Sequence, residues 1–490
     1  MTFLNSLRSD TYVYGAALLS ERIISFFMLP VLINAVSVVE YAIWTQSIVT
    51  SGLMVTFILL GFNTAIVKFV PSFEDDPKLS YSLLKAMCLS ILTWSIIISL
   101  LIHMFSLEIS VLVFGNLAYQ GFIPILILLI ISEAIFDFII SLLRARRRIR
   151  TASVYIFIKG IWRLSLIIIS IYIFESGFFV GFLVFVILQF IIVVCMSLYH
   201  LPAGALIVSS LDLGKENWIG VIKFSLPLVV VAALTFFNNF TDRYFITYFI
   251  GLEKLANYAA VYSLAAIGGI FYSTLGFTFF PELSRQWKSS SKNQKGELIG
   301  EAFIFYLFFQ IPFIFGLSIV GPYLMAILSG SLINAPFSLY ILLGTNIALF
   351  GIYQIFWYVV LLGSGSLSGF KILFIASIMN ILFNFLMVPV IGILGAAISG
   401  SLSNFILVLL SFYIAKQSAV IRIPWKTLKD ILLRSSCLGF LLFLCNLLFL
   451  KYVEVSVLLL YYHVENHLIS NLLFDHSLIY PLVLTLLQLH

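Results

Sequence analysis

Four pairs of charged residues interrupt apolar stretches that are otherwise long enough to cross a membrane. They are Glu21 and Arg22, Glu133 and Asp137, Lys159 and Arg163, and Asp242 and Arg243. A charge at the centre of a bilayer costs about 2.5–3.5 kcal/mol, so each of these residues is expected to be paired or to face water. The four bases could bind an anionic head group. The four carboxylates could act as counter-ions or could titrate to couple an ion.

Two of the pairs flank an arginine-rich turn. Asp137 and Glu133 come seven and eleven residues before the Arg144–Arg150 segment. Lys159 and Arg163 come nine and thirteen residues after it. In a helical hairpin, Asp137 would therefore face Lys159, and Glu133 would face Arg163. The spacing of four puts both acids on one helix face and both bases on another. These pairs either lock the hairpin or form a cavity wall that binds an anion, and both interpretations stay open.

Arg22 and Arg243 have carboxylates only as sequence neighbours. Adjacent residues on a helix do not face each other, so Glu21 and Asp242 do not neutralise these guanidinium groups locally. Each arginine therefore needs a second partner.

The composition excludes a soluble enzyme and a disordered chain. Of 490 residues, 62% are hydrophobic, 16% are aromatic and 10% are charged. Soluble domains are about 45–50% apolar and about 25% charged. The apolar segments are long and continuous, which predicts an all-α integral membrane protein instead of a barrel of alternating strands.

Thirteen segments are long enough to span a bilayer. They run at about 12–35, 41–67, 81–105, 122–143, 151–174, 177–200, 221–250, 256–280, 299–320, 335–362, 367–388, 391–415 and 431–450. A fourteenth span after Glu454 is doubtful, because His463, Glu465, His467 and Asp475 interrupt the apolar run. The prediction is thirteen spans with a short or irregular C-terminal segment.

The loops between these spans are asymmetric in charge. If the N-terminus is cytoplasmic, nineteen Lys and Arg residues fall in inside loops, and only Lys254 and Lys451 fall outside. This asymmetry orients the protein by the positive-inside rule and explains the net charge of +6 without nucleic acid. The four cysteines lie in apolar segments, where they are expected to be buried thiols.

Signals for catalysis are missing from the sequence. It contains no phosphate-binding GxxxxGK[ST] motif and no His/Cys cluster with metal-ligand spacing, so ATP hydrolysis and a metal site are not expected. The largest outside loops before the C-terminus are predicted at about Ser106–Gly121 and Gly321–Asn334, too short for a catalytic domain. Asparagines inside the spans, such as Asn346, Asn380 and Asn404, are expected to bond helices to one another more than to bind sugars.

Two sequence blocks recur in the two halves of the chain. Tyr41-Ala42 opens the second span and Tyr258-Ala259 the eighth, and these spans end in Pro71-Ser72 and Pro281-Glu282. Because the blocks are six spans apart, the halves would have the same orientation. This predicts two parallel-repeat six-helix bundles, a pattern of many secondary transporters.

Several motifs resemble one known family. They are Ser225-Leu226-Pro227-Leu228, Asp242-Arg243, the 257–263 block NYAAVYS, Phe280-Pro281-Glu282-Leu283-Ser284, Asn380-Ile381-Leu382-Phe383-Asn384, Pro389 and the 392–397 block GILGAA. Together they resemble the polysaccharide and lipid-linked oligosaccharide exporters, including O-antigen flippases, of the multidrug/oligosaccharidyl-lipid/polysaccharide (MOP) superfamily. The resemblance runs from about Arg8 to Ala415.

The resemblance implies an architecture and a function. Residues 1–209 and 210–415 would form two lobes around a central cavity that opens to alternate leaflets, and residues 416–490 would add one or two helices. The protein would be a flippase, not an enzyme, in a bacterial inner membrane. It would move a polyprenyl-diphosphate-linked oligosaccharide from the cytoplasmic to the periplasmic leaflet. No cofactor is implied beyond H⁺ or Na⁺ as coupling ion, and membrane lipid and polysaccharide synthesis enzymes are the expected partners.

Three alternatives stay open. A cation-coupled multidrug exporter of the same superfamily should have an acidic, aromatic site, yet the buried acids and bases here are equal in number. A membrane-embedded glycan polymerase should have a long outside loop, which is not predicted. The lipid-linked peptidoglycan precursor is a further candidate cargo.

The charge asymmetry generates the first prediction. A cysteine introduced at Lys292, in a chain whose four native cysteines are replaced by alanine, should react with an impermeant maleimide only when the cytoplasmic face is accessible. Labelling of this position in intact cells would contradict both the orientation and the list of spans.

Overall fold

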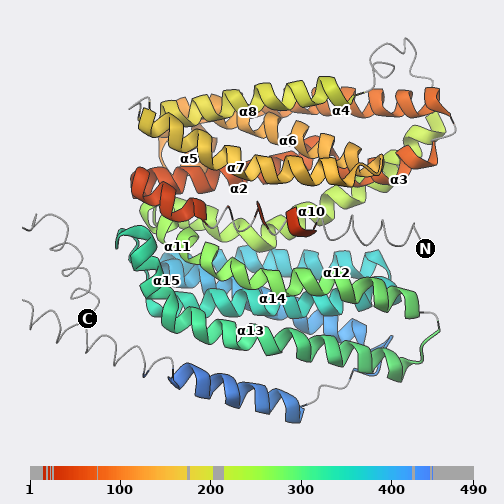
Figure 1. The fold of residues 1–490 in the computed structure, drawn as a ribbon, viewed down its shortest axis with the longest axis vertical. Helices are drawn as coiled ribbons and strands as arrows, with labels where there is room; N and C mark the ends of the chain where they lie inside the picture. Colours follow the sequence, from red (N-terminus) through yellow and green to blue (C-terminus); the bar gives the residue numbers. More distant parts are fainter. Residues whose placement is uncertain are drawn as a thin grey trace, which may run out of the picture.

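The protein is all-helical over the ranges that the structure describes. This computed structural model describes residues 15–17, 20, 21, 24, 27–73, 76–173, 177–201, 215–287, 289–421, 425–441 and 444. Within them, nine helical segments are long and apolar enough to cross a membrane (Figure 1). Large apolar side chains such as Leu92, Leu100 and Phe385 are more than half exposed, as expected for a surface that contacts lipid tails. The predicted all-α membrane fold is confirmed.

The helices of the first half lie together on one side of the molecule (Figure 1). They are α2 (Val38–Leu59), α3 (Phe62–Ser72), α4 (Pro77–Met104), α5 (Ser106–Phe114), the 3₁₀ helix η1 (Leu117–Phe122), α6 (Ile123–Ala145), α7 (Ile149–Ile173) and α8 (Phe178–His200). Local sequence sets several of their starts. Ser37 and Glu40 form a capping box at α2, and Asp76 caps α4, whose first residue is Pro77.

The second half begins with a helix that runs along the first. This helix, α10 (Lys215–Phe249), starts beside α3 at one end of the molecule and ends near α11 at the other (Figure 1). The helices that follow are α11 (Leu252–Ala265), the 3₁₀ helix η2 (Ala266–Gly268), α12 (Gly269–Gln286), α13 (Lys292–Ser329), α14 (Phe337–Gly363) and α15 (Ser366–Ala415). Helix α15 contains the eleventh and twelfth predicted spans, which meet at Gly392 with φ 64° and ψ −140°. Glycine reaches these angles because it has no Cβ atom.

Each of the thirteen predicted spans overlaps a helix in the described ranges, but two predicted loops are wrong. The first, Ser106–Gly121, folds as α5 and η1. Asn116 lies between them and caps η1, because its side-chain oxygen accepts a hydrogen bond from the backbone N–H of Ala118 at 2.9 Å. The sequence predicts a loop here because this segment lies between two predicted spans. Most of the second, Gly321–Asn334, continues α13 to Ser329. The segment after Glu454 lies outside the described residues.

Two spans are interrupted at internal breaks. The second span breaks at Leu60 and Gly61, which have φ values of 51° and 74°, and the eighth breaks at η2. These are the two spans that carry the recurring sequence blocks. The parallel repeat and the division at residues 209 and 415 stay predictions.

Amide side chains join the helices of the second half. Asn238 of α10 donates to Asn404 of α15 at 2.8 Å, and Asn404 donates to Asn346 of α14 at 2.9 Å. Asn380 donates to Ser403 at 2.8 Å, across the two segments of α15. These buried bonds support the expected inter-helix role of the asparagines.

Gly61 generates the second prediction. It adopts a left-handed conformation, and a Cβ added to it would lie 2.5 Å from the carbonyl oxygen of Ser225 on α10. Gly61→Ala should therefore lower the thermal stability of the purified protein, because left-handed strain alone costs about 1–3 kcal/mol. Gly316→Ala is the matched control, since nothing lies within 4 Å of its Cβ position in helix α13. Equal melting temperatures for the two variants would contradict the close α3–α10 approach.

Candidate functional site

A cavity of about 480 Å³ lies between the first half of the chain and α10. Its walls come from α2, α3, α6, α7 and α10, with Glu21 from the segment before α2. Five of the eight predicted site residues line it, namely Glu21, Glu133, Asp137, Lys159 and Arg163. The remaining polar lining includes Asn63 and Thr64, which follow the break at Gly61.

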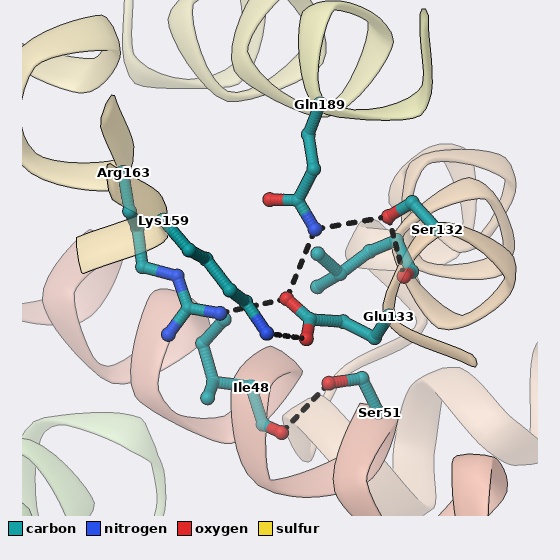
Figure 2. Close-up of polar contacts among 8 residues, drawn as sticks. Ile48, Ser51, Ser132, Glu133, Lys159, Arg163 and Gln189 are labelled. Carbon is teal, nitrogen blue, oxygen red and sulfur yellow. Dashed lines mark hydrogen bonds and ion pairs between the residues drawn. The ribbon is translucent and has the colours of Figure 1, made fainter. Parts of the chain in front are cut away.

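The carboxylate of Glu133 on α6 is the centre of the polar wall (Figure 2). Its Oε2 atom lies 2.5 Å from Nζ of Lys159, and its Oε1 atom lies 2.7 Å from Nη2 of Arg163. Nε2 of Gln189, on α8, also donates to Oε1 at 2.9 Å and reaches Oγ of Ser132 at 3.1 Å. One buried carboxylate thus joins three helices.

The spacing of four explains why both bases reach one acid. Lys159 and Arg163 are one turn apart on the same face of α7, so their side chains can converge on Glu133 from adjacent turns. The ring of Phe136 lies 4.1 Å from Nζ of Lys159 and adds a cation–π contact on the α6 side. The geometry is a fork around a single carboxylate.

The expected pair between Asp137 and Lys159 is therefore wrong. Glu133 and Asp137 on α6 lie at similar depth to Lys159 on α7, so the long lysine side chain could reach either carboxylate. In the structure it extends towards Glu133. The expected Glu133–Arg163 pair is confirmed. Asp137 is exposed in the cavity, and its carboxylate has no hydrogen bond or ion pair among the residues that the structure describes.

The fork leaves donors unused. Nε of Arg163 is buried without a hydrogen-bond partner within the described part of the chain, and Figure 2 shows contacts from only one of its three guanidinium nitrogens. A guanidinium has five N–H donors, so Arg163 can accept a further anion without releasing Glu133 completely. Arg163 can therefore donate hydrogen bonds to an oxygen-rich ligand while it still contacts Glu133.

The described wall of the cavity is not net positive. It carries three carboxylates, of Glu21, Glu133 and Asp137, and two bases, Lys159 and Arg163. Arg22 lies outside the described residues. No group of three or more His, Cys, Asp or Glu residues that could hold a metal ion occurs in the described ranges.

The remaining predicted pair lies elsewhere. Asp242 and Arg243 sit on the second half of α10 and do not line the cavity. The carboxylate of Asp242 accepts from the hydroxyl of Tyr258 and, at 2.8 Å, from the backbone N–H of Arg243. The structure thus brings together five of the predicted residues and separates these two from them.

Gln189 is the site residue that the sequence reading missed. It is fully buried and is the only amide in α8, a helix of 23 residues that is otherwise almost entirely apolar. A lone polar side chain in such a helix is a detectable signal, because burying an unpaired amide in an apolar environment is costly. Ser132 and Tyr258 carried no comparable signal.

Comparison with known proteins identifies the family. Residues 7–287, more than half of the chain, match the family of polysaccharide biosynthesis proteins. The capsular polysaccharide biosynthesis protein CapF of Staphylococcus aureus is 23% identical over 198 residues, which cover 40% of this chain and 50% of CapF. The probable low-salt glycan biosynthesis flippase Agl15 of Haloferax volcanii is 24% identical over 260 residues, which cover 50% of this chain and 55% of Agl15. The chain thus spans about half the length of each of these two relatives.

A solved structure shares the fold over almost the whole chain. The lipid II flippase MurJ, in an inward closed conformation, superimposes with a TM-score of 0.71 at 16% identity and covers 97% of both chains. At this identity, the likeness concerns the fold. The family match confirms the resemblance seen in the sequence motifs, and the chain belongs to the polysaccharide biosynthesis protein family.

Proposed function

We propose that this protein is a flippase for a lipid-linked oligosaccharide, with the phosphate-bearing head group bound at Lys159 and Arg163. The observation that carries the proposal is the fork of two bases on Glu133 at the wall of a cavity inside the membrane-spanning region. The names of CapF, Agl15 and MurJ, which refer to polysaccharide biosynthesis, glycan flipping and lipid II flipping, support the same cargo class.

Competition with Glu133 explains how such a site can bind and release. A diphosphate offers several charged oxygens, and guanidinium groups bind phosphate through two parallel hydrogen bonds. When the head group enters, it takes the unused donors of Arg163 first and then shares Lys159 with Glu133. When it leaves, Glu133 recovers both bases, so neither state contains an unpaired buried cation.

The size of the cavity suits a head group. Ligand sites of about 300–1,000 Å³ are typical for small molecules, and this cavity measures about 480 Å³. The diphosphate and the first sugars would occupy it, and Asn63 and Thr64 supply hydrogen-bonding groups for hydroxyls. The polyprenyl tail would stay in the surrounding lipid.

The finer features of the proposal come from the sequence. We infer movement from the cytoplasmic to the periplasmic leaflet of a bacterial inner membrane, with the N-terminus in the cytoplasm, from the charge asymmetry of the loops. A repeat unit of O-antigen or of another surface polysaccharide is the proposed cargo, and the peptidoglycan precursor is the alternative. H⁺ or Na⁺ is the proposed coupling ion, and Asp137 and Glu21, the two cavity-lining carboxylates outside the fork, are the groups proposed to bind it. Polysaccharide synthesis enzymes on the cytoplasmic face are proposed partners.

One observation favours a second function. The described cavity wall has one more carboxylate than bases, which would suit the cationic cargo of a multidrug exporter of the same superfamily. The fork argues against it, because Glu133 is already neutralised by two bases and Lys159 would repel a cation. The two functions differ in the charge of their cargo, so a direct measurement separates them.

The third prediction concerns cargo. In proteoliposomes, the protein should translocate a fluorescent polyprenyl-diphosphate oligosaccharide and not a cationic dye. Lys159→Gln should reduce this translocation at least about tenfold, the effect of losing one charge-assisted contact. Lys254→Gln, at an exposed lysine outside the cavity, should leave the rate unchanged. Dye transport without glycan translocation would establish the multidrug function instead.

The fourth prediction compares the two acids of α6. Glu133→Gln leaves Lys159 and Arg163 without their shared carboxylate and should destabilise the protein, because breaking a buried ion pair costs about 3–5 kcal/mol. Asp137→Asn removes a carboxylate that has no ion partner in the described part of the chain, and the melting temperature should stay within about one degree. Both variants are read by folded yield and thermal melting in detergent. Equal losses would mean that Asp137, too, supports the bases.

A further inference from the structure

A second guanidinium is buried far from the cavity. Arg243, on α10, is only 7% exposed, and its Nε atom has no hydrogen-bond partner among the described residues. No described carboxylate lies within ion-pair distance of it. This differs from Arg163, which shares Glu133 with Lys159.

The surroundings of Arg243 only partly compensate its charge. The guanidinium carbon lies 5.0 Å from the ring centre of Tyr262 and 5.5 Å from that of Phe240. Cation–π contacts recover only part of the free energy that burying a charge costs. The neighbouring carboxylate of Asp242 is held by Tyr258 and by a backbone N–H. An anion would complete this environment.

The position of Arg243 coincides with the seam between the two halves of the chain. One residue further along α10, the hydroxyl of Tyr244 lies 3.0 Å from Oγ1 of Thr50 on α2. Near the end of α10, a Cβ at Gly115 would lie 2.7 Å from the carbonyl oxygen of Thr247, so the end of α5 also packs closely on α10. Asn34 donates to the carbonyl of Leu328 across the same two halves at 2.9 Å. Tyr244 and Thr247 thus tie the part of α10 that carries Arg243 to the first half of the chain.

The cavity and Arg243 lie at different levels of the same helix. The cavity contacts α10 at Leu228–Ala232, and Arg243 comes eleven residues after Ala232. At 1.5 Å per residue, this is roughly 16 Å along the helix axis. The charge count predicts that this helix runs from the inside to the outside, so Arg243, in the second half of α10, lies towards the predicted outside end.

We propose that Arg243 is a second anion site, which receives the phosphate of the cargo when the seam between the halves opens. This inference rests on the proposed flippase function and adds an exit site to it. While the seam is closed, Tyr262 and Phe240 hold the guanidinium in place. When the seam opens, a phosphate that leaves Lys159 and Arg163 meets the guanidinium of Arg243. Two parallel N–H donors of this guanidinium can bind the phosphate in a bidentate manner.

The test separates binding in the closed state from translocation. Farnesyl diphosphate is the binding probe, and the purified full-length protein is titrated with it. A fluorescent polyprenyl-diphosphate oligosaccharide in proteoliposomes reports translocation. Arg243→Gln should bind farnesyl diphosphate within about twofold of the parent and translocate at least about tenfold more slowly. Arg243→Lys, which keeps the charge without the fork, should fall between them. Lys159→Gln should lose both activities.

A third variant controls for a purely structural role. Arg243→Met replaces a buried charge with an apolar side chain of similar length, so its melting temperature should equal or exceed that of the parent, and it should not translocate. A lower melting temperature together with lost translocation would overturn the proposal, because Arg243 would then be a packing residue.

Other outcomes are equally decisive. Normal translocation by Arg243→Gln would overturn the exit site and leave the flippase function intact. Loss of probe binding by Arg243→Gln would also overturn it, because Arg243 would then belong to the first site. Failure of the parent protein to bind the probe and to translocate the oligosaccharide would instead refute the proposed function.

Discussion

The carboxylate of Glu133 holds two cations from one neighbouring helix and an amide from another, inside a chain of which 62% is hydrophobic. In that setting, a charge without a partner is costly, so each ionisable side chain needs a structural explanation. The fork gives Lys159 and Arg163 a shared counter-ion and, with Gln189, ties α6, α7 and α8 together. It also leaves Asp137, which lines the cavity, without an ion partner among the described residues.

The two halves of the molecule use different polar chemistry. The first half places charged groups against the cavity, whereas α10, α14 and α15 are joined by neutral amides such as Asn238, Asn346 and Asn404. Neutral bonds keep their strength over a wide pH range and in the changing ionic surroundings of a transport cycle. If the charged wall binds the proposed cargo, it would rearrange around it while the neutral bonds of the second half keep their packing.

The sequence predicted the helices well because a bilayer requires about 20 apolar residues per crossing, and the chain contains many apolar runs of that length. The prediction of a loop at Ser106–Gly121 was wrong, because the two helices there, α5 and η1, are too short to be recognised by the length that a membrane span requires. The same physical cost of buried charge identified Glu133, Lys159 and Arg163, yet the partner of Lys159 was wrong. The ion-pair partner of a lysine depends on where its charged Nζ atom lies. The position of the residue along the helix predicts the location of that atom only to within about one helical turn. For Arg243, the sequence indicated a missing counter-ion but not the distance from the cavity, because that depends on how α10 crosses between the halves.

A transporter must bind its cargo without trapping it, and the two guanidinium environments suggest how this balance is set. A ligand that bound one conformation far more tightly than the other would stabilise that conformation and stop the cycle. At the cavity, Glu133 would compete with the proposed phosphate for Lys159 and Arg163 and weaken its binding. At Arg243, no described carboxylate lies within ion-pair distance, but the proposed site would become accessible only after the seam opened, which would break contacts such as that between Thr50 and Tyr244. The cost of opening the seam would then reduce the net affinity there, as the competing carboxylate does at the first site. The site at Lys159 and Arg163 and the site at Arg243 would then bind the cargo with similar net affinities, although their intrinsic affinities differ. Similar net affinities allow a modest driving force to move the cargo from one site to the other.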